Sequence, residues 1–181
     1  FPAPYCTVDG YGVEEITKIE FDGLEITNTN DTSFLVNHTA EVAEVVAGQT
    51  YTLTVQGNTY GDENEFYAFI DWNHNGFLDD TGEIYYIGRL EDSDGEDGLS
   101  VSLDITVPTT AIAGATRIRI TKTWIMEGFE MNIDPCWISG YDEFWEEADG
   151  SYGQAIDFTL DVDSDNEAPE PGEGCEIEIN L

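Results

Sequence analysis

The clearest secondary-structure signal in the chain is the run FYAFIDW at residues 66–72. Its aromatic and aliphatic residues alternate so that Phe66, Ala68 and Ile70 can face one side, which is the two-residue period of a β-strand. Other short runs with the same period are bounded by Gly, Asn, Asp or Pro. They cover residues 16–21, 51–55, 84–90, 99–107, 116–123 and 155–162.

Helical periodicity is nearly absent from the chain. Residues 41–46 could form one helical turn, but Val45, Val46 and the nearby Gly48 favour the end of a strand. So many short strands in one domain bury their apolar faces best as two sheets packed face to face. The sequence therefore predicts an all-β fold, a β-sandwich with jelly-roll or Greek-key-like connections and one long aromatic loop insertion.

The charge of the chain is strongly one-sided. Five Lys and Arg residues stand against 39 Asp and Glu residues, which gives a formal net charge of −34. This field would repel the phosphates of nucleic acids and of anionic membranes, so we expect neither as a partner. Membrane insertion is not expected either, because no apolar run approaches the roughly 20 residues that span a bilayer. Such self-repulsion needs screening by cations, which favours a secreted or cell-surface location.

Two stretches depart from the strand pattern. Residues 124–150 form a long insertion rich in aromatic and acidic residues, a composition typical of a functional loop. Residues 163–181 form an acidic tail with several Pro and Gly, a composition typical of a linker, and residues 177–181 could begin a further module. We therefore expect one folded domain over residues 1–162, followed by the linker and neighbouring domains of the same chain.

The three cysteines, Cys6, Cys136 and Cys175, allow one disulfide with one thiol left over. The preferred pair is Cys6–Cys136, because Cys175 lies in the tail and can pair outside this chain. Three free thiols remain the alternative.

Residues 71–76, DWNHNG, match the start of a calcium loop of the form D-x-[DN]-x-[DN]-G. Ca²⁺ takes six to eight hard oxygen ligands, and a chain that curls round one ion turns every second side chain inward. Asp71, Asn73 and Asn75 would supply three oxygens, and the Phe77 carbonyl a fourth. Gly76 would permit the sharp turn between them.

The closure of this loop is irregular. The glutamate expected at the twelfth position falls on Gly82, and Glu83 follows one residue later. Asp79 and Asp80 offer nearer carboxylates, so we expect Asp79 or Asp80, together with Glu83, to complete a Ca²⁺ site. The alternative is a hairpin whose Asn and Asp side chains bond their own backbone. Calcium is preferred because carboxylates packed so densely would repel one another without a counter-ion.

Two other possible metal sites are less well supported. Zinc is not expected, because the chain has two histidines and scattered cysteines. A second acidic cluster at residues 92–98 lacks the full ligand spacing, and we expect it to form a solvated turn.

The aromatic insertion has the composition of a carbohydrate site. Trp124, Trp137, Tyr141 and Trp145 offer rings on which a sugar can stack, and Glu143 lies among them as a hydrogen-bond acceptor. The expected partner is a polysaccharide or a cell-surface glycan. The alternative is that Trp124 and Trp137 fill the open end of the sandwich.

Arg117 and Arg119 lie two residues apart and therefore share one face of a predicted strand. They could clamp an acidic sugar. In so acidic a chain we favour pairing with neighbouring carboxylates.

Several patterns together resemble the GEVED domain, a module of secreted multidomain proteins in Bacteroidetes. The resemblance extends from Pro4 to Val162 and is carried by PYC at 4–6, AGQTYTLTV at 47–55, IDWNHNGF at 70–77, DTGE at 80–83, VP at 107–108 and AGATRIRI at 113–120. The motif GEVEDYTL that names the family appears here as GQAIDFTL at 153–160, with Gln154 and Ile156 in place of both glutamates. The resemblance implies an exported, non-catalytic β-sandwich attached to enzymes or adhesins.

Three functions are compatible with these features. The preferred one is a calcium-binding accessory module that binds carbohydrate or mediates surface adhesion. The second is a structural spacer without a ligand. An enzyme is the least supported, because a chain with 39 acids contains carboxylate pairs by chance and has no nucleophile elbow, Ser/His/Asp grouping or zinc-protease signature.

Overall fold

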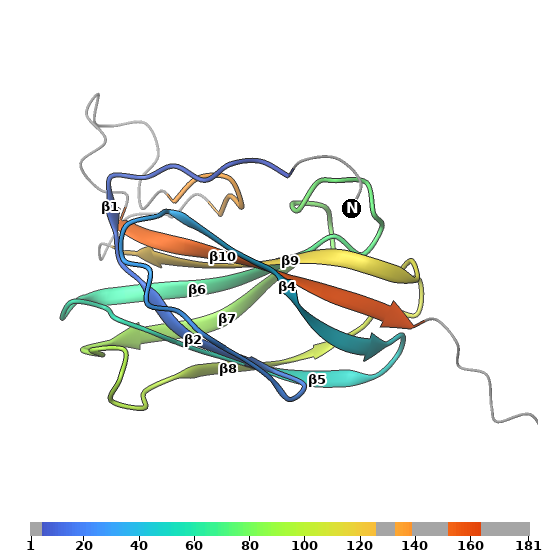
Figure 1. Ribbon diagram of the computed structural model, residues 1–181, viewed down its shortest axis with the longest axis horizontal. Coiled ribbons are helices and arrows are strands. Elements are labelled where there is room, and N and C mark those ends of the chain that lie inside the picture. Colours follow the sequence, from blue (N-terminus) through green and yellow to red (C-terminus); the bar gives the residue numbers. More distant parts are fainter. Residues whose placement is uncertain (1–4, 126–132, 139–151, 164–181) are drawn as a thin grey trace, which may run out of the picture.

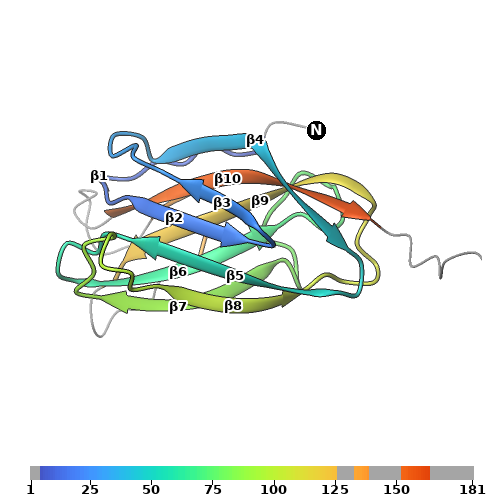
Figure 2. The same cartoon turned by 60° about the horizontal axis from the view of Figure 1, so that its bottom comes forward.

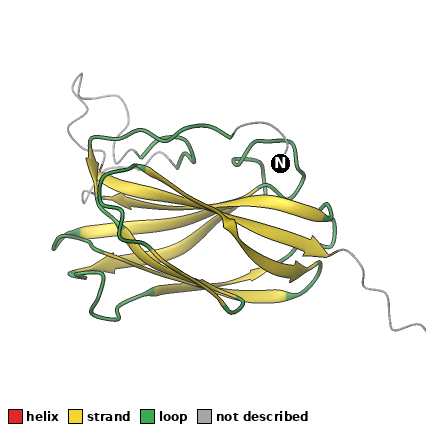
Figure 3. Ribbon diagram, in the orientation of Figure 1, coloured by secondary structure: helices red, strands yellow, loops and turns green. Residues whose placement is uncertain are grey.

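The structure, a computed structural model, describes residues 5–125, 133–138 and 152–163. These residues form ten β-strands and no helix (Figure 3). Within this part of the chain there is accordingly no helix long and apolar enough to cross a bilayer. The strands are β1 (Gly12–Val13), β2 (Ile16–Phe21), β3 (Leu24–Thr27), β4 (Leu35–Val46), β5 (Thr50–Gly57), β6 (Glu63–Ile70), β7 (Ile84–Glu91), β8 (Val101–Thr106), β9 (Gly114–Trp124) and β10 (Tyr152–Asp163).

The strands are arranged in two sheets that lie face to face (Figures 1 and 2). The larger sheet has six strands in the order β1-β10-β9-β6-β7, and β4 also pairs with β10. The smaller sheet has the order β3-β2-β5-β8. Strand β10 pairs in parallel with β1 and β4 but antiparallel with β9. The all-β sandwich predicted from the sequence is therefore confirmed.

The core lies between the two sheets and is built from alternate residues of their strands. On β6, Phe66, Ala68 and Ile70 face inward and are buried, as the alternation predicted. Apolar residues of β2, β5, β8, β9 and β10 meet them from both sheets. Burial of this apolar surface is the main favourable contribution to folding.

All the strand segments expected from the sequence overlap observed strands, but some boundaries differ. Strand β6 begins at Glu63 and ends at Ile70, so Asp71 and Trp72 lie in the following loop and not in the strand. The strand ends there because the Trp72 amide turns back to the Ile70 carbonyl at 3.0 Å. Residues 41–46 lie within β4, which confirms their interpretation as strand.

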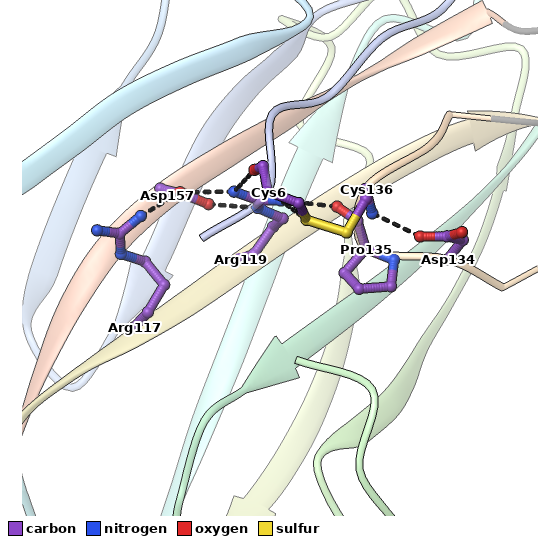
Figure 4. Close-up of a disulfide and its surroundings, with 7 residues drawn as sticks. All are labelled: Cys6, Arg117, Arg119, Asp134, Pro135, Cys136 and Asp157. Atoms are coloured by element: carbon purple, nitrogen blue, oxygen red, sulfur yellow. Dashed lines mark hydrogen bonds and ion pairs between the residues drawn. A yellow bond between two sulfur atoms is a disulfide. The ribbon is translucent and has the colours of Figure 1, made fainter. Parts of the chain in front are cut away.

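The outer side of the six-stranded sheet carries two further segments, the chain before β1 and residues 133–138 (Figure 1). A disulfide joins them between Cys6 and Cys136, the pair preferred from the sequence (Figure 4). Val8 and Ile138 pack beside this disulfide against Ala155 of β10, which forms a second small apolar cluster. Cys175 lies outside the described residues.

Candidate metal centre

The loop between β6 and β7, residues 71–83, begins and ends on buried acids. Asp71 directly follows β6 and is 0% exposed, and Glu83 directly precedes β7 and is 3% exposed. The Ile70 amide donates to the Glu83 carbonyl at 2.9 Å, which brings the two ends of the loop together. The sheet therefore places two carboxylates at the base of one loop.

The carboxylate of Asp71 organises the first half of this loop. Its Oδ1 accepts the Asn75 amide at 3.1 Å, and its Oδ2 accepts the Gly76 amide at 3.0 Å. Gly76 has a φ of 86°, in the left-handed region that favours glycine. The main chain thus curls round the Asp71 carboxylate.

Asp80 draws the two asparagines together on the other side. Its Oδ2 accepts the side-chain amides of Asn73 at 2.9 Å and of Asn75 at 2.6 Å. The Oδ1 atoms of these asparagines accept main-chain amides two residues further on, at Asn75 and Phe77. The structure therefore combines the convergence expected of a cation loop with the Asx turns expected of the alternative hairpin.

Glu83 is the least satisfied acid of the loop. Its Oε1 accepts the Asn73 amide at 3.3 Å, whereas its Oε2 is buried without a hydrogen-bond partner in the described part of the chain. Burial, and then the negative charge of Asp71, raise the pKa of Glu83 to about 7. The loop therefore holds a buried carboxylate oxygen that no donor of the described chain meets.

Five of the predicted ligands are joined in this way, and two are not. Asp71, Asn73, Asn75, Asp80 and Glu83 form one hydrogen-bonded network. Asp79 is exposed, and within residues 71–83 no hydrogen bond or ion pair joins it to this network. Phe77, whose main-chain carbonyl was the predicted ligand, contacts the loop through its amide, which donates to Asn75 Oδ1 at 2.8 Å.

Carboxylates alone do not make a site here. Over the described ranges, no three His, Cys, Asp or Glu side chains are grouped to hold a metal ion. A cation at this loop would therefore need oxygens of Asn73, Asn75 or the main chain in addition to the acids.

The sequence did not point to several residues that hold the loop from outside. The Tyr5 hydroxyl donates to Asp71 Oδ2 at 2.7 Å, and the Thr116 hydroxyl donates to the Asp71 carbonyl. Trp72 is buried and donates its indole N–H to the Tyr85 hydroxyl at 2.9 Å. Local spacing does not link Tyr5 and Thr116 to Asp71, because they lie 66 and 45 residues away in sequence, whereas Trp72 is the next residue of the loop itself.

Arg117 and Arg119 both pair with Asp157, so the expected pairing with carboxylates is confirmed (Figure 4). Arg119 is completely buried and donates through Nε and Nη2 to the two oxygens of Asp157 at 2.7 and 2.9 Å. Its other donors reach Cys6 and the Pro135 carbonyl. Asp157 is the acid kept from the GEVEDYTL motif, and here it forms ion pairs with two guanidinium groups.

The predicted carbohydrate residues are only partly described. Trp137 is 42% exposed beside the disulfide and forms an isolated bridge with Asp9. This exposure contradicts the alternative that Trp137 fills the end of the core. Trp124, at the end of β9, is half-buried and meets Tyr152 edge to face at 6.0 Å. Tyr141, Glu143 and Trp145 lie outside the described residues.

The acidic cluster at residues 92–98 is closed by its own backbone. Asp97 accepts the amides of Leu99 at 2.9 Å and of Asp94 at 3.2 Å, and the Ser93 hydroxyl at 3.1 Å. Asp94 in turn accepts the Glu96 amide. This arrangement is the turn expected from the sequence.

The fold and this loop define a class, namely an acidic β-sandwich module with one irregular, oxygen-rich loop between two neighbouring strands of its larger sheet. Residues 65–161 match the GEVED domain, which is more than half of the chain. The chain therefore belongs to the GEVED domain family. The match contains the loop at 71–83, both arginines and Asp157.

No curated protein matches the chain. Among solved structures, a superoxide reductase (neelaredoxin) from Ignicoccus hospitalis is 10% identical, with a TM-score of 0.31 over 66% of this chain and 74% of that one. AvmM, described as catalysing macrocyclization in alchivemycin A biosynthesis, is 11% identical, with a TM-score of 0.35 over 96% of this chain and 100% of that one. Likenesses this weak indicate neither a shared fold nor a shared activity.

Proposed function

We propose that this domain is a calcium-binding, non-catalytic accessory module of a secreted multidomain protein. One observation carries the metal half of the proposal, the buried Glu83 Oε2 that no donor of the described chain meets, next to the buried Asp71. A buried carboxylate is costly unless it is paired with a cation or bound by donors. A hard divalent cation would neutralise both acids at once.

The residues present fit such an ion. Asp71, Asp80 and Glu83 would supply carboxylate oxygens, and Asn73 and Asn75 would supply amide oxygens. The two amide groups turn their nitrogens toward Asp80, and their Oδ1 atoms accept main-chain amides. Each amide oxygen has a second lone pair that would be available to a cation. Calcium here would supply charge and rigidity.

The test is calcium titration by calorimetry in a chelator-treated protein. We expect calcium uptake by the wild type and at least tenfold weaker binding by Glu83→Gln and by Asp80→Asn, because each removes a charged oxygen ligand. Asp79→Asn is the matched control, since it makes the same change in the same loop at a side chain outside the network, and it should bind as the wild type does. Absence of calcium uptake by the wild type would refute the metal site.

The binding half of the proposal is carbohydrate recognition, and the exposed indole of Trp137 supports it. Exposed aromatic rings stack on the apolar faces of sugars, and a ring held beside a disulfide loses little entropy on binding. The partner would be a polysaccharide or a cell-surface glycan.

Affinity gels containing soluble polysaccharides test this half. A binding polysaccharide should retard the wild type and not Trp137→Ala. Tyr86→Ala, which removes another exposed ring on β7, should remain retarded. If no polysaccharide retards the wild type, the domain is better described as a spacer between its neighbours.

A further inference from the structure

The chain before β1 reaches the metal loop from the opposite end of the sequence. Tyr5 donates its hydroxyl to Asp71 Oδ2, while the adjacent Cys6 is tied to Cys136. We propose that Tyr5 is a positioning residue for the calcium loop and that the Cys6–Cys136 disulfide keeps it in place, so that calcium affinity depends on the redox state of this disulfide. This inference rests on the proposed calcium site.

Tyr5 acts on the carboxylate that organises the loop. Asp71 Oδ2 accepts both the Tyr5 hydroxyl at 2.7 Å and the Gly76 amide at 3.0 Å. The two donors fix the rotation of the carboxylate and therefore the direction in which its lone pairs face the loop. Partners that orient a metal ligand in this way typically change metal affinity 10- to 100-fold when they are removed.

The Tyr5 ring is itself held firmly. The Arg117 guanidinium lies over it at 4.7 Å from the ring centre, and Arg117 is in turn paired with Asp157. The contact between the ring and Arg117 therefore fixes the position from which the Tyr5 hydroxyl donates to Asp71.

One guanidinium binds the main chain on both sides of the disulfide. Arg119 donates to the Cys6 carbonyl at 3.0 Å, to the Cys6 sulfur at 3.3 Å and to the Pro135 carbonyl at 2.8 Å (Figure 4). Asp157 takes its remaining donors, so all five N–H groups of this buried side chain are used. The disulfide and Arg119 therefore anchor the residue next to Tyr5 at two points.

Reduction would remove one of these anchors. A dithiol reductant would transfer two electrons and two protons, break the bond between the two sulfurs and leave two thiols while the reductant itself becomes a disulfide. The bond joins residues 130 apart in sequence, so its loss frees the segment that carries Tyr5 to leave the sheet. Asp71 would then lose its outer donor.

The experiment compares calcium affinity and amide exchange in matched variants, all with Cys175→Ser to exclude other disulfides. Tyr5→Phe keeps the ring over Arg117 and removes only the hydroxyl, and we expect about tenfold weaker calcium binding. Tyr60→Phe removes another tyrosine-to-carboxylate bond, to Glu15 at 2.7 Å, and should leave the affinity unchanged. In the calcium-free protein, Tyr5→Phe should also speed hydrogen exchange at the Gly76 amide.

A second set of measurements compares the Cys6→Ser/Cys136→Ser variant and the reduced protein with the oxidised protein. Both should bind calcium several-fold more weakly than the oxidised protein, and Tyr5→Phe should add less to that loss than it does alone, because coupled residues are not additive. If the wild type binds calcium but Tyr5→Phe binds it equally well with unchanged Gly76 exchange, this inference is wrong and the calcium site stands. If the wild type takes up no calcium, the proposed function itself fails.

Discussion

Asp71 and Glu83 are both buried carboxylates, and the chain treats them differently. The Asp71 carboxylate accepts hydrogen bonds from Tyr5, Asn75 and Gly76, which stabilise its negative charge. Glu83 receives the Asn73 amide on one oxygen, and its other oxygen has no donor in the described structure. The difference makes Glu83 the residue whose protonation should respond to pH in the calcium-free protein.

The stability of the calcium-free protein should fall as the pH rises from about 4.5 to 7. Burial raises the folded pKa of Glu83 from its usual 4.5 to about 7, so over this interval the folded chain holds a proton that the unfolded chain has lost. The stabilisation is complete below the unfolded pKa and is lost as the pH passes the folded one. The whole shift corresponds to about 3 kcal/mol, and the part of it that is titrated between pH 5 and pH 7.5 to about 1–3 kcal/mol.

Urea unfolding in the presence of a chelator measures this effect at pH 5 and pH 7.5. Glu83→Gln cannot ionise at this position, so it should lose about 1–3 kcal/mol less than the wild type between the two values. The same pH dependence in both proteins would contradict the assignment of this titration to Glu83. Calcium should restore the stability that the wild type loses at pH 7.5, and should stabilise Glu83→Gln less, because that variant binds the ion more weakly.

Among the strands, β10 is the one whose sequence is most constrained by its neighbours. It pairs with β9 on one side and with β1 and β4 on the other, so its backbone is enclosed. At Gly153, an added Cβ would lie 1.9 Å from the Lys122 carbonyl oxygen of β9. This contact gives a physical reason for the glycine that the chain shares with the GEVEDYTL motif.

Gly153→Ala should therefore destabilise the domain by about 2–4 kcal/mol, since two paired strands would have to separate. Gly61→Ala is the control, because a Cβ there has no atom within 4 Å. Its expected cost in stability is about 1 kcal/mol and comes only from the φ of 90°, which an alanine adopts unfavourably. Chemical denaturation of both variants measures the two costs. Equal costs would show that β9 and β10 can separate at Gly153 without loss.

The sequence predicted the strands whose alternation is unbroken and missed those in which it is interrupted. Strand β4 buries Val36 in its first half but Ala43 and Val45 in its second. The residues that face inward therefore change from even-numbered to odd-numbered positions along the strand. The change coincides with a shift of register against β10 between Asp157 and Thr159. A fixed two-residue period cannot represent such a strand, and β3, with four residues, is too short to show one.

The candidate site likewise contains some residues that the sequence could predict and others that it could not. Asp71, Asn73, Asn75, Asp80 and Glu83 lie within one loop, so their spacing was visible in the sequence. Tyr5 and Arg119 depend on contacts between distant segments, which periodicity does not report. The choice between Asp79 and Asp80 also needed the structure, since only Asp80 reaches the two asparagines.

At the scale of the whole molecule, the surface is almost uniformly negative. Of the five basic residues, Arg119 and Lys122 are fully buried, and Lys122 is paired with Glu14 at 2.9 Å. The acids therefore have few cationic partners at the surface. Two separate effects of cations on stability follow, one from general screening and one from the loop.

Sodium chloride should raise the melting temperature of the chelator-treated protein by several degrees between about 10 mM and 0.5 M, because screening weakens the repulsion among surface acids. Calcium at about 100 times its dissociation constant should add about 2.7 kcal/mol at low salt, or roughly 5–10 °C. Asp71→Asn should keep the sodium effect and lose most of the calcium effect. Equal responses to both salts in this variant and the wild type would mean that calcium acts by screening alone.

The last strand of the described residues is also an inner strand of the larger sheet. Because β10 lies between β9 on one side and β1 and β4 on the other, β1, β4 and the β9-β6-β7 group stay separate until β10 has been synthesised. A nascent chain that stops short of β10 has no way to join them. Closure of the larger sheet therefore waits for its most C-terminal strand among the described residues, whereas the smaller sheet, β3-β2-β5-β8, contains no part of β10.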